Sequence, residues 1–304
     1  MPAVAVWLRA VRAPSLTAGV MPVVVALAAA RAEGHAIQPL HAFGVVLGLI
    51  ALQCGVNLVN DYFDDASGLD ADPDFEDSAF PLGSRVLQLG LVSRPAMKRA
   101  AIGCFAVGAG CGVWLDTIHP GHVVLVLGGV GVALGYFYTA PPLQIAYRGA
   151  GEPITFSLFG PVAGLGAYYV LTGTGSAAAV VVSCVVGLLA MAILFLHHFP
   201  QRAADARHGK RTPIVRLGYQ RAGRLVPAIL AAPYALVLGS VLAGVLGWPA
   251  LAFWATAPLA VRVARTAWSR PDHDRAMAGA AMQTLALHFS GSLLLALGVG
   301  WTGS

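Results

Sequence analysis

A group of polar residues follows a long apolar run that ends near residue 56. Asn57, Asn60, Asp61 and Asp64 are spaced so that a helix would place them on one face. Carboxylates on one face repel each other unless a cation lies between them. Oxygen ligands favour a hard ion, and Mg²⁺ is usually held by one or two carboxylates together with substrate phosphates. These residues therefore predict a Mg²⁺ and phosphate site at the end of a buried helix.

The alternative is that this acidic segment only begins a solvated loop. Eight of the 14 acidic residues lie between Asp61 and Asp77, so a loop of this kind must be considered. The solvated interpretation suits the distal acids, whereas Asn60, Asp61 and Asp64 fall within the helical pattern. The acids that we expect to be solvated are Asp72, Asp74, Glu76 and Asp77.

A second charged segment carries seven of the 19 basic residues, between Arg202 and Arg224. Gln201 and Asp205 are four residues apart, and Arg202 and Lys210 lie close enough in sequence to hold phosphate oxygens. The alternative is a basic loop that only sets membrane topology. The adjacent His197 and His198 lack a third nearby ligand, which argues against zinc. If both charged segments face one cavity, it suits a Mg²⁺-bound diphosphate on a lipid-soluble tail.

The elements that must position these residues are membrane-spanning helices. Apolar residues make up 57% of the 304 residues and charged residues 11%, against roughly 45–50% and 25% in soluble domains. A spanning helix needs about 20 apolar residues. We therefore predict one all-α, polytopic membrane domain over residues 1–304, with about nine transmembrane helices around a central cavity. The predicted spans centre on Val24, Leu49, Val107, Leu127, Ala163, Leu188, Val237, Ala257 and Leu294.

The distribution of basic residues predicts the orientation in the membrane. With nine spans, 18 of the 19 basic residues fall on one side, and only Arg31 falls on the other. Basic residues concentrate in cytoplasmic connections. We therefore expect a multi-pass protein of the cell's inner or plasma membrane, with its N-terminus and both charged segments in the cytoplasm. The net charge of +5 is explained by this bias, and no nucleic-acid partner is expected.

The sequence resembles the UbiA superfamily of intramembrane prenyltransferases, and most closely its menaquinone-type branch, which prenylates 1,4-dihydroxy-2-naphthoate. The stretch from Asn57 through Asp64 to Gly68-Leu69-Asp70 is similar to the first aspartate-rich motif of that family. Asp205, followed by Gly209 to Thr212, is similar to the end of the second motif. Further similar stretches are Gly83–Val86, Gly90–Ser93, Tyr138-Thr139, Tyr147–Glu152, Gly160-Pro161 and Val215–Gly218.

The resemblance implies transfer of a prenyl group from a (poly)prenyl diphosphate to an aromatic acceptor through a Mg²⁺-assisted allylic cation. The partners would then be these two substrates and the lipid bilayer. The implied catalytic residues are Asp61, Asp64 and Asp205, and the implied metal ligands are Asn60, Asp61, Asp64, Asp70 and Asp205. The diphosphate would bind to Asn57, Asn60, Arg85, Arg148, Arg202, Lys210 and Gln201. Tyr62, Tyr138, Tyr147 and Tyr168 are expected to form the prenyl and acceptor pocket, because π faces stabilise cations.

The sequence departs from the family pattern at three places. Gln201 stands where the second motif usually begins with Asp, His197 and His198 replace a pair of Asn, and Ala146 replaces a Lys. These departures leave two other functions open. One is a terpene cyclase of the same superfamily, in which the cation is quenched internally. The other is a non-catalytic or transport membrane protein, although transporters carry charges on broken helices near the membrane midplane.

Overall fold

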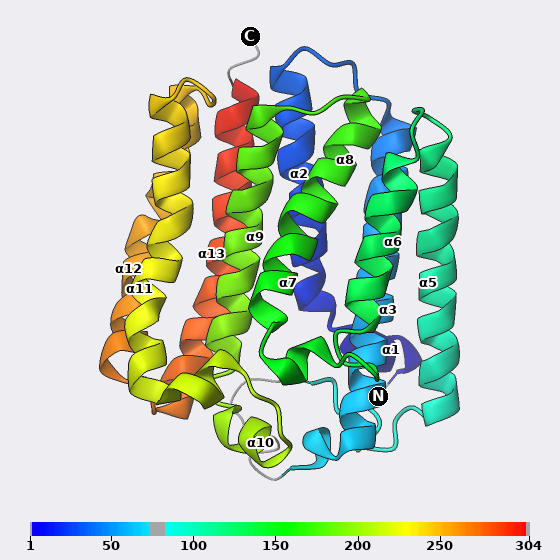
Figure 1. Ribbon diagram of the computed structural model, residues 1–304, viewed down its shortest axis with the longest axis vertical. Helices are drawn as coiled ribbons and strands as arrows, with labels where there is room; N and C mark the ends of the chain where they lie inside the picture. Colours follow the sequence, from blue (N-terminus) through cyan, green and yellow to red (C-terminus); the bar gives the residue numbers. More distant parts are fainter. Residues whose placement is uncertain (1, 73–82, 302–304) are drawn as a thin grey trace.

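The computed structural model describes residues 2–72 and 83–301, and every regular element in these ranges is a helix. The helices stand side by side along the long axis of the molecule (Figure 1). The all-α prediction is therefore confirmed.

In chain order the elements are α1 (Ala3–Ala10), the 3₁₀ helix η1 (Ala13–Leu16), α2 (Thr17–Ala32), α3 (Pro39–Ser67), the 3₁₀ helix η2 (Leu69–Ala71), α5 (Arg94–Asp116), α6 (Val123–Tyr136), the 3₁₀ helix η3 (Ile145–Arg148), α7 (Gly151–Ser157), the π-helical turn η4 (Leu158–Val162), α8 (Ala163–Thr172), α9 (Ala177–His197), α10 (Arg202–Arg207), α11 (Pro213–Leu242), the 3₁₀ helix η5 (Trp248–Thr256), α12 (Ala257–Ser269) and α13 (Asp274–Gly300).

Seven helices of the described chain are long and apolar enough to cross a membrane. Two of the nine predicted spans differ from them. The helix centred near Leu127 is α6, whose 14 residues cover about 21 Å at 1.5 Å per residue, less than a hydrocarbon core of about 30 Å. The segment near Ala257 is divided between η5 and the 13-residue α12. The seven spans are Ala13–Ala32, Pro39–Ser67, Arg94–Asp116, Gly151–Thr172, Ala177–His197, Pro213–Leu242 and Asp274–Gly300.

The hydrophobic core lies around α9, which Figure 1 shows beside α13 and α7. Val185 and Leu189 of α9, and Leu287 and Leu295 of α13, are fully buried. Helix α9 is apolar on all sides, which is typical of a helix surrounded by protein and lipid. Helix α9 packs against α2, α7, α8, α11 and α13.

Glycines allow the segment formed by α7 and η4 to lie directly against α9. A Cβ atom on Gly160 would lie 2.9 Å from the Cα atom of Gly187, and a Cβ atom on Gly187 would lie 2.5 Å from the carbonyl oxygen of Phe156. No side chain fits at these distances, so the two backbones can approach only because both positions are glycine. This contact fixes the start of α7 beside the end of α9.

Helix α3 ends at Gly68, which has a φ of 81°. Its amide donates to the carbonyl oxygens of Asp64 and Asp65, and this left-handed conformation favours glycine. The chain then turns sharply into η2. The turn carries Asp70 back toward the last turns of α3, where Asp64 lies.

Both charged segments lie at the same end of the molecule. Figure 1 shows α10, the end of α3 and the N-terminus at this end, whereas the connection between α2 and α3 and the C-terminus lie at the other. Because the two termini lie at opposite ends of the bundle, the chain must run along the bundle an odd number of times. Asp72, which we expected to be solvated, is instead buried and hydrogen-bonded to Arg207 and His208. Asp74, Glu76 and Asp77 lie outside the described residues.

The orientation can be tested with single cysteines in a variant from which the four native cysteines have been removed. Ala206→Cys lies on exposed α10, and Gly175→Cys lies in the exposed connection between α8 and α9 at the opposite end. Because basic residues concentrate in the cytoplasm, we expect an impermeant maleimide to label Gly175→Cys but not Ala206→Cys in intact cells. Ser78→Cys should also be shielded. Labelling of Ala206→Cys from outside would reverse the predicted orientation.

Candidate functional site

The polar residues of the last turns of α3 are buried, as their spacing predicted. Asn57, Asp61 and Asp64 are 9%, 2% and 7% exposed. Asn57, Asn60 and Asp64 line a cavity, whereas Asp61 forms an ion pair with Arg12 and accepts a hydrogen bond from Ser84. The first motif therefore divides into a cavity-facing set and one carboxylate that connects α3 to the N-terminal segment.

Hydrogen bonds from three other elements hold the cavity-facing set in place. The side-chain amide of Asn57 donates to the carbonyl oxygen of Val11 at 2.9 Å. Asn60 accepts a hydrogen bond from Thr139 at 2.8 Å, and Asp64 accepts one from the hydroxyl of Tyr147 at 2.9 Å. These side chains are positioned before any ligand binds, which reduces the free-energy cost of binding.

Asp70 lies close to the α3 carboxylates. It is 2% exposed, and its Oδ2 atom has no hydrogen-bond partner. Burial raises the pKa of Asp70 to about 8, and the negative charges of Asp64 and Asp61 add to this effect. A carboxylate in this setting requires either a proton or a nearby cation.

The second motif places Lys210 in the cavity lining and Asp205 beside Lys210, outside that lining. Asp205 is completely buried, and neither of its carboxylate oxygens has a hydrogen-bond partner. Its Oδ1 lies 3.8 Å from the Nζ atom of Lys210. Burial raises the pKa of Asp205. Burial alone lowers the pKa of Lys210, but Asp205, Asp64 and Asp70 together raise it, so that Lys210 stays charged.

The carboxylates have the properties expected of ligands for a divalent cation. Within the described ranges, no three His, Cys, Asp or Glu side chains are gathered closely enough to hold a metal by themselves. Asp70 and Asp205 nevertheless lie close enough to Asp64 for its charge to raise their pKa, and their unpartnered buried oxygens need a partner. Mg²⁺ typically takes one or two carboxylates together with phosphate oxygens. The donor set therefore fits a Mg²⁺ ion that is shared with a phosphate ligand.

The cavity has a polar end and an apolar body. Its volume is about 1190 Å³, and it extends from the carboxylates into the space between α3, α5, α6 and α8. Gln201, Lys210 and Tyr138 line it near the polar end. Burial raises the pKa of Tyr138, and the charge of Glu152 raises it further, so that this phenol remains protonated. The body is lined mainly by aliphatic side chains and glycines, including Leu52, Val56, Gly112, Gly131, Val132 and Val162.

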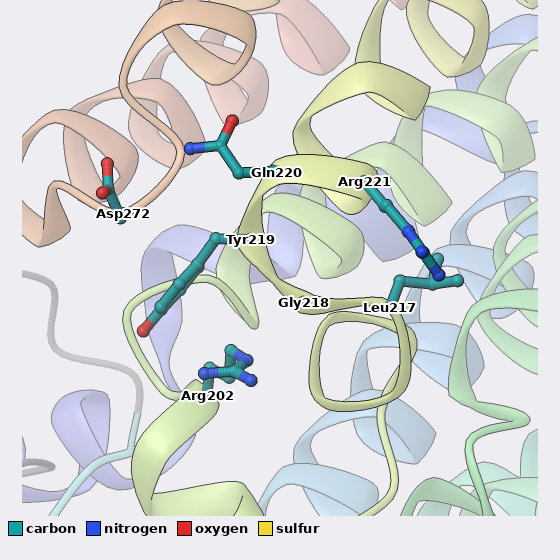
Figure 2. A pocket seen from close by; sticks show the side chains of 7 residues that line it. All are labelled: Arg202, Leu217, Gly218, Tyr219, Gln220, Arg221 and Asp272. Carbon is teal, nitrogen blue, oxygen red and sulfur yellow. The ribbon is translucent and has the colours of Figure 1, made fainter.

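Three predicted diphosphate-binding arginines do not line this cavity. Arg148 is exposed and donates to the carbonyl oxygen of Pro142 at 3.0 Å. Arg202 lies in a separate surface pocket with its guanidinium 4.8 Å from the ring centroid of Tyr219 (Figure 2). Arg85 is half-buried outside the cavity lining. Sequence proximity to the motifs did not reveal that these side chains lie outside the cavity lining.

Two of the four predicted pocket tyrosines also lie elsewhere. Tyr62 packs against Phe63 and Arg94 on the side of α3 away from the cavity. Tyr168 donates to Glu33 at the opposite end of the bundle, because α8 carries it away from the carboxylates. Tyr138 lines the cavity as predicted. Tyr147 is outside the cavity lining but contacts Asp64, and its ring centroid lies 5.5 Å from the Nζ atom of Lys210.

Several site residues were not identified from the sequence. Arg12 was counted only as a charge that sets topology, yet it lines the cavity and pairs with Asp61. Ser84 accompanies it, and Arg9 donates from Nε to the carbonyl oxygen of Ser84 at 2.7 Å. The sequence signal is that Arg12 directly precedes the first apolar run, and a basic residue there lies at the same end of the bundle as the two charged segments.

The comparisons with known proteins agree with this geometry. A family model described as the UbiA prenyltransferase family matches residues 19–298. The chain belongs to the UbiA prenyltransferase family. It is an integral membrane protein and a transferase, as the resemblance implied.

Relatives and solved structures agree with this membership. The prenyltransferase is 30% identical over 301 residues to the 2-carboxy-1,4-naphthoquinone phytyltransferase of Synechocystis sp., covering 98% of this chain and 94% of that one. It is 29% identical over 298 residues to the 1,4-dihydroxy-2-naphthoate octaprenyltransferase of Escherichia coli, covering 92% of each chain. The menaquinone-type branch is therefore confirmed.

Two solved UbiA homologues share the fold of this prenyltransferase. The apo structure from Aeropyrum pernix K1 gives a TM-score of 0.70 at 18% identity, covering 93% of this chain and 96% of that one. A homologue from Archaeoglobus fulgidus, bound to GPP and Mg²⁺, gives 0.61 at 15% identity, covering 95% and 99%. At these identities the likeness shows the fold alone.

The ion pair between Arg12 and Asp61 makes a testable contribution to stability. Arg12→Ala would leave the 2%-exposed Asp61 without its cation, which should cost about 3 kcal/mol. We expect a clear decrease in the Tm of the purified protein in detergent. Replacing Asp61 as well, in Arg12→Ala/Asp61→Asn, should recover part of the loss because no unpaired charge remains. An additive loss in the double variant would contradict the pairing.

Proposed function

We propose that this protein transfers a prenyl chain from a prenyl diphosphate to a hydroxylated naphthalene acceptor that carries a carboxylate, of the 1,4-dihydroxy-2-naphthoate type. One observation carries the proposal: the carboxylate and lysine end of the cavity opens directly into an apolar body within a cavity of about 1190 Å³. A prenyl diphosphate has the same division between a charged head and an apolar tail. The naphthoate-prenylating relatives supply the class of acceptor.

The diphosphate head binds where the two motifs meet. Lys210 donates to its oxygens, and the neutral amides of Asn60 and Gln201 add hydrogen bonds without adding negative charge. Asp64, Asp70 and Asp205 would hold Mg²⁺. When bound, the ion supplies positive charge that stabilises the leaving diphosphate.

The apolar body protects the allylic cation that forms when the carbon–oxygen bond breaks. Aliphatic side chains exclude water, which would otherwise capture the cation as an alcohol. Tyr138 offers a π face beside the polar end. Because its phenol remains protonated, Tyr138 can stabilise the cation without attacking it. The electron-rich ring of the acceptor then forms the new carbon–carbon bond.

The substrates reach the site from the cytoplasmic end under this proposal. The N-terminus, α10 and the end of α3 face the cytoplasm, and residues 1–304 form one membrane domain within the inner or plasma membrane. The test is an assay of membranes containing the protein, with several prenyl diphosphates, a naphthoate acceptor and Mg²⁺, read by mass spectrometry. Prenylated naphthoate supports the proposal. Cyclised hydrocarbon without acceptor product would identify a terpene cyclase, and no Mg²⁺-dependent diphosphate release would exclude both enzymes.

Asp64 and Asp65 form a matched pair for testing the first motif. Asp64 faces the cavity, whereas Asp65 is bound to Arg94 at 2.6 Å and to Gln88 at 2.9 Å. We expect Asp64→Asn to reduce turnover by about two orders of magnitude or more, the scale of one lost electrostatic contact. Asp65→Asn should retain turnover within a few fold. Equal activity of the two variants would show that the cavity carboxylate does not handle the diphosphate.

Gln201 tests how the second motif handles charge. A neutral amide cannot neutralise Mg²⁺, so Asp205→Ala should abolish activity whereas Gln201→Ala should cost about tenfold, the scale of one neutral hydrogen bond. Gln201→Asp adds a carboxylate beside the cavity, and we expect it to lower the Mg²⁺ concentration needed for half-maximal activity. Identical Mg²⁺ titrations for the wild type and Gln201→Asp, with full activity in Asp205→Ala, would remove the second motif from the site.

A further inference from the structure

His198 and Glu152 form a buried pair at the polar end of the cavity. Their side chains are 3% and 6% exposed, and His198 Nδ1 lies 3.1 Å from Glu152 Oε1. A carboxylate can only accept a hydrogen bond, so the proton of a neutral His198 is on Nδ1. This assignment leaves Nε2 as the nitrogen that can accept a proton.

The fold holds this pair beside the reacting groups. His198 lines the cavity together with Asp64, Tyr138 and Lys210. Glu152 lies in the first turn of α7, which the glycine contacts with α9 hold in place. A Cβ atom on Gly151 would lie 2.8 Å from the hydroxyl of Tyr138, so the start of α7 is also packed closely against Tyr138. His198 is therefore at the end of the cavity where the diphosphate would leave.

The other ionisable groups that line this end have different roles. Asp64 and Asp70 belong to the expected cation site, and Lys210 carries a positive charge that the carboxylates stabilise. The cavity lining contains His197 and His198, and His198 is paired with the carboxylate of Glu152. A carboxylate that orients an imidazole through Nδ1, with Nε2 directed to substrate, is a common arrangement for a general base.

We propose that His198 is the general base that accepts the hydroxyl proton of the aromatic acceptor, and that Glu152 is the positioning residue that orients it. This inference rests on the function proposed above and adds the group that activates the acceptor. The family pattern has Asn at this position, and the side-chain amide of Asn cannot accept the proton. The imidazole of His198 can.

The proposed step balances in atoms and charge. The bond between the prenyl C1 atom and the diphosphate oxygen breaks, and its electron pair leaves with the diphosphate. The hydroxyl proton of the acceptor passes to Nε2 of His198, while the neighbouring ring carbon forms the bond to the prenyl C1 atom. The hydrogen on that ring carbon is then lost to solvent as His198 returns its proton to the oxygen, which restores the aromatic ring. The net products are prenylated acceptor, diphosphate and one proton.

The test separates acceptor activation from diphosphate ionisation. His198→Gln removes the proton acceptor while keeping a polar side chain of similar size. We expect transfer to fall by about a hundredfold or more, the scale of general-base catalysis. Slow release of diphosphate from the prenyl diphosphate without acceptor should fall far less than transfer does, because ionisation of the prenyl diphosphate does not require the base. His41→Gln, at the opposite end of the bundle beside Trp114, is the matched control and should transfer normally.

A series of ring-substituted 1,4-dihydroxy-2-naphthoates with increasingly acidic hydroxyl groups gives a second readout. An acidic hydroxyl needs less help from a base, so the loss in His198→Gln should shrink steadily as the hydroxyl becomes more acidic. Glu152→Gln should show the same trend with a smaller loss, and Glu152→Asp should restore part of it. A merely structural role would reduce transfer to every acceptor, and diphosphate release, by the same factor.

The possible outcomes keep the two proposals distinguishable. Full transfer by a folded His198→Gln protein, or an equal loss for all acceptors, would overturn the general-base role while leaving prenyl transfer intact. Absence of transfer to any of these dihydroxynaphthoates by the wild type would overturn the proposed function and this inference with it. Thermal unfolding of each variant in detergent shows that the comparison is made on folded protein.

Discussion

Burial of several carboxylates at one end of an apolar helix bundle is the constraint on which the site depends. Asp61, Asp64, Asp70 and Asp205 are each 7% exposed or less. Charged groups in such surroundings need opposite charges, hydrogen bonds or protons. The protein satisfies Asp61 with Arg12 and Ser84, and Asp64 with Tyr147, but it leaves oxygens of Asp70 and Asp205 without hydrogen-bond partners. The unsatisfied oxygens are the part of the site that a cation and its phosphate ligand would complete.

The rest of the bundle positions this charged end through close packing. Gly68 ends α3 and returns Asp70 toward Asp64. The contact between Gly160 and Gly187 places α7 against α9, and so brings Glu152 to His198. Small residues achieve this because close packing of helices in lipid depends on backbone approach. Close packing between helices, away from the polar end, therefore holds the polar side chains at that end in place.

The division of the cavity explains how one site can handle two unlike parts of a substrate. The polar end provides charge for the diphosphate, and the apolar body provides a surface that excludes water. Charges inside such a body are costly, which confines the ionisable groups to one end. The position of His198 at the boundary between the two regions suits a group that acts on the acceptor at the point where the new bond forms.

The sequence by itself determined the fold class, the family and most of the first motif. Periodic apolar runs predicted the spanning helices, and the spacing of Asn57, Asn60 and Asp64 placed them correctly on a cavity-facing side of α3. The short span at α6 was predicted too long, because hydropathy does not report where a helix begins and ends. Only the tertiary structure decided that Arg148 and Arg202 lie outside the cavity lining, that Tyr168 lies at the far end, and that Arg12 and Glu152 join the site. The physical reason is that local spacing determines which residues share a helix face, whereas contacts between helices distant in the sequence determine what that face meets.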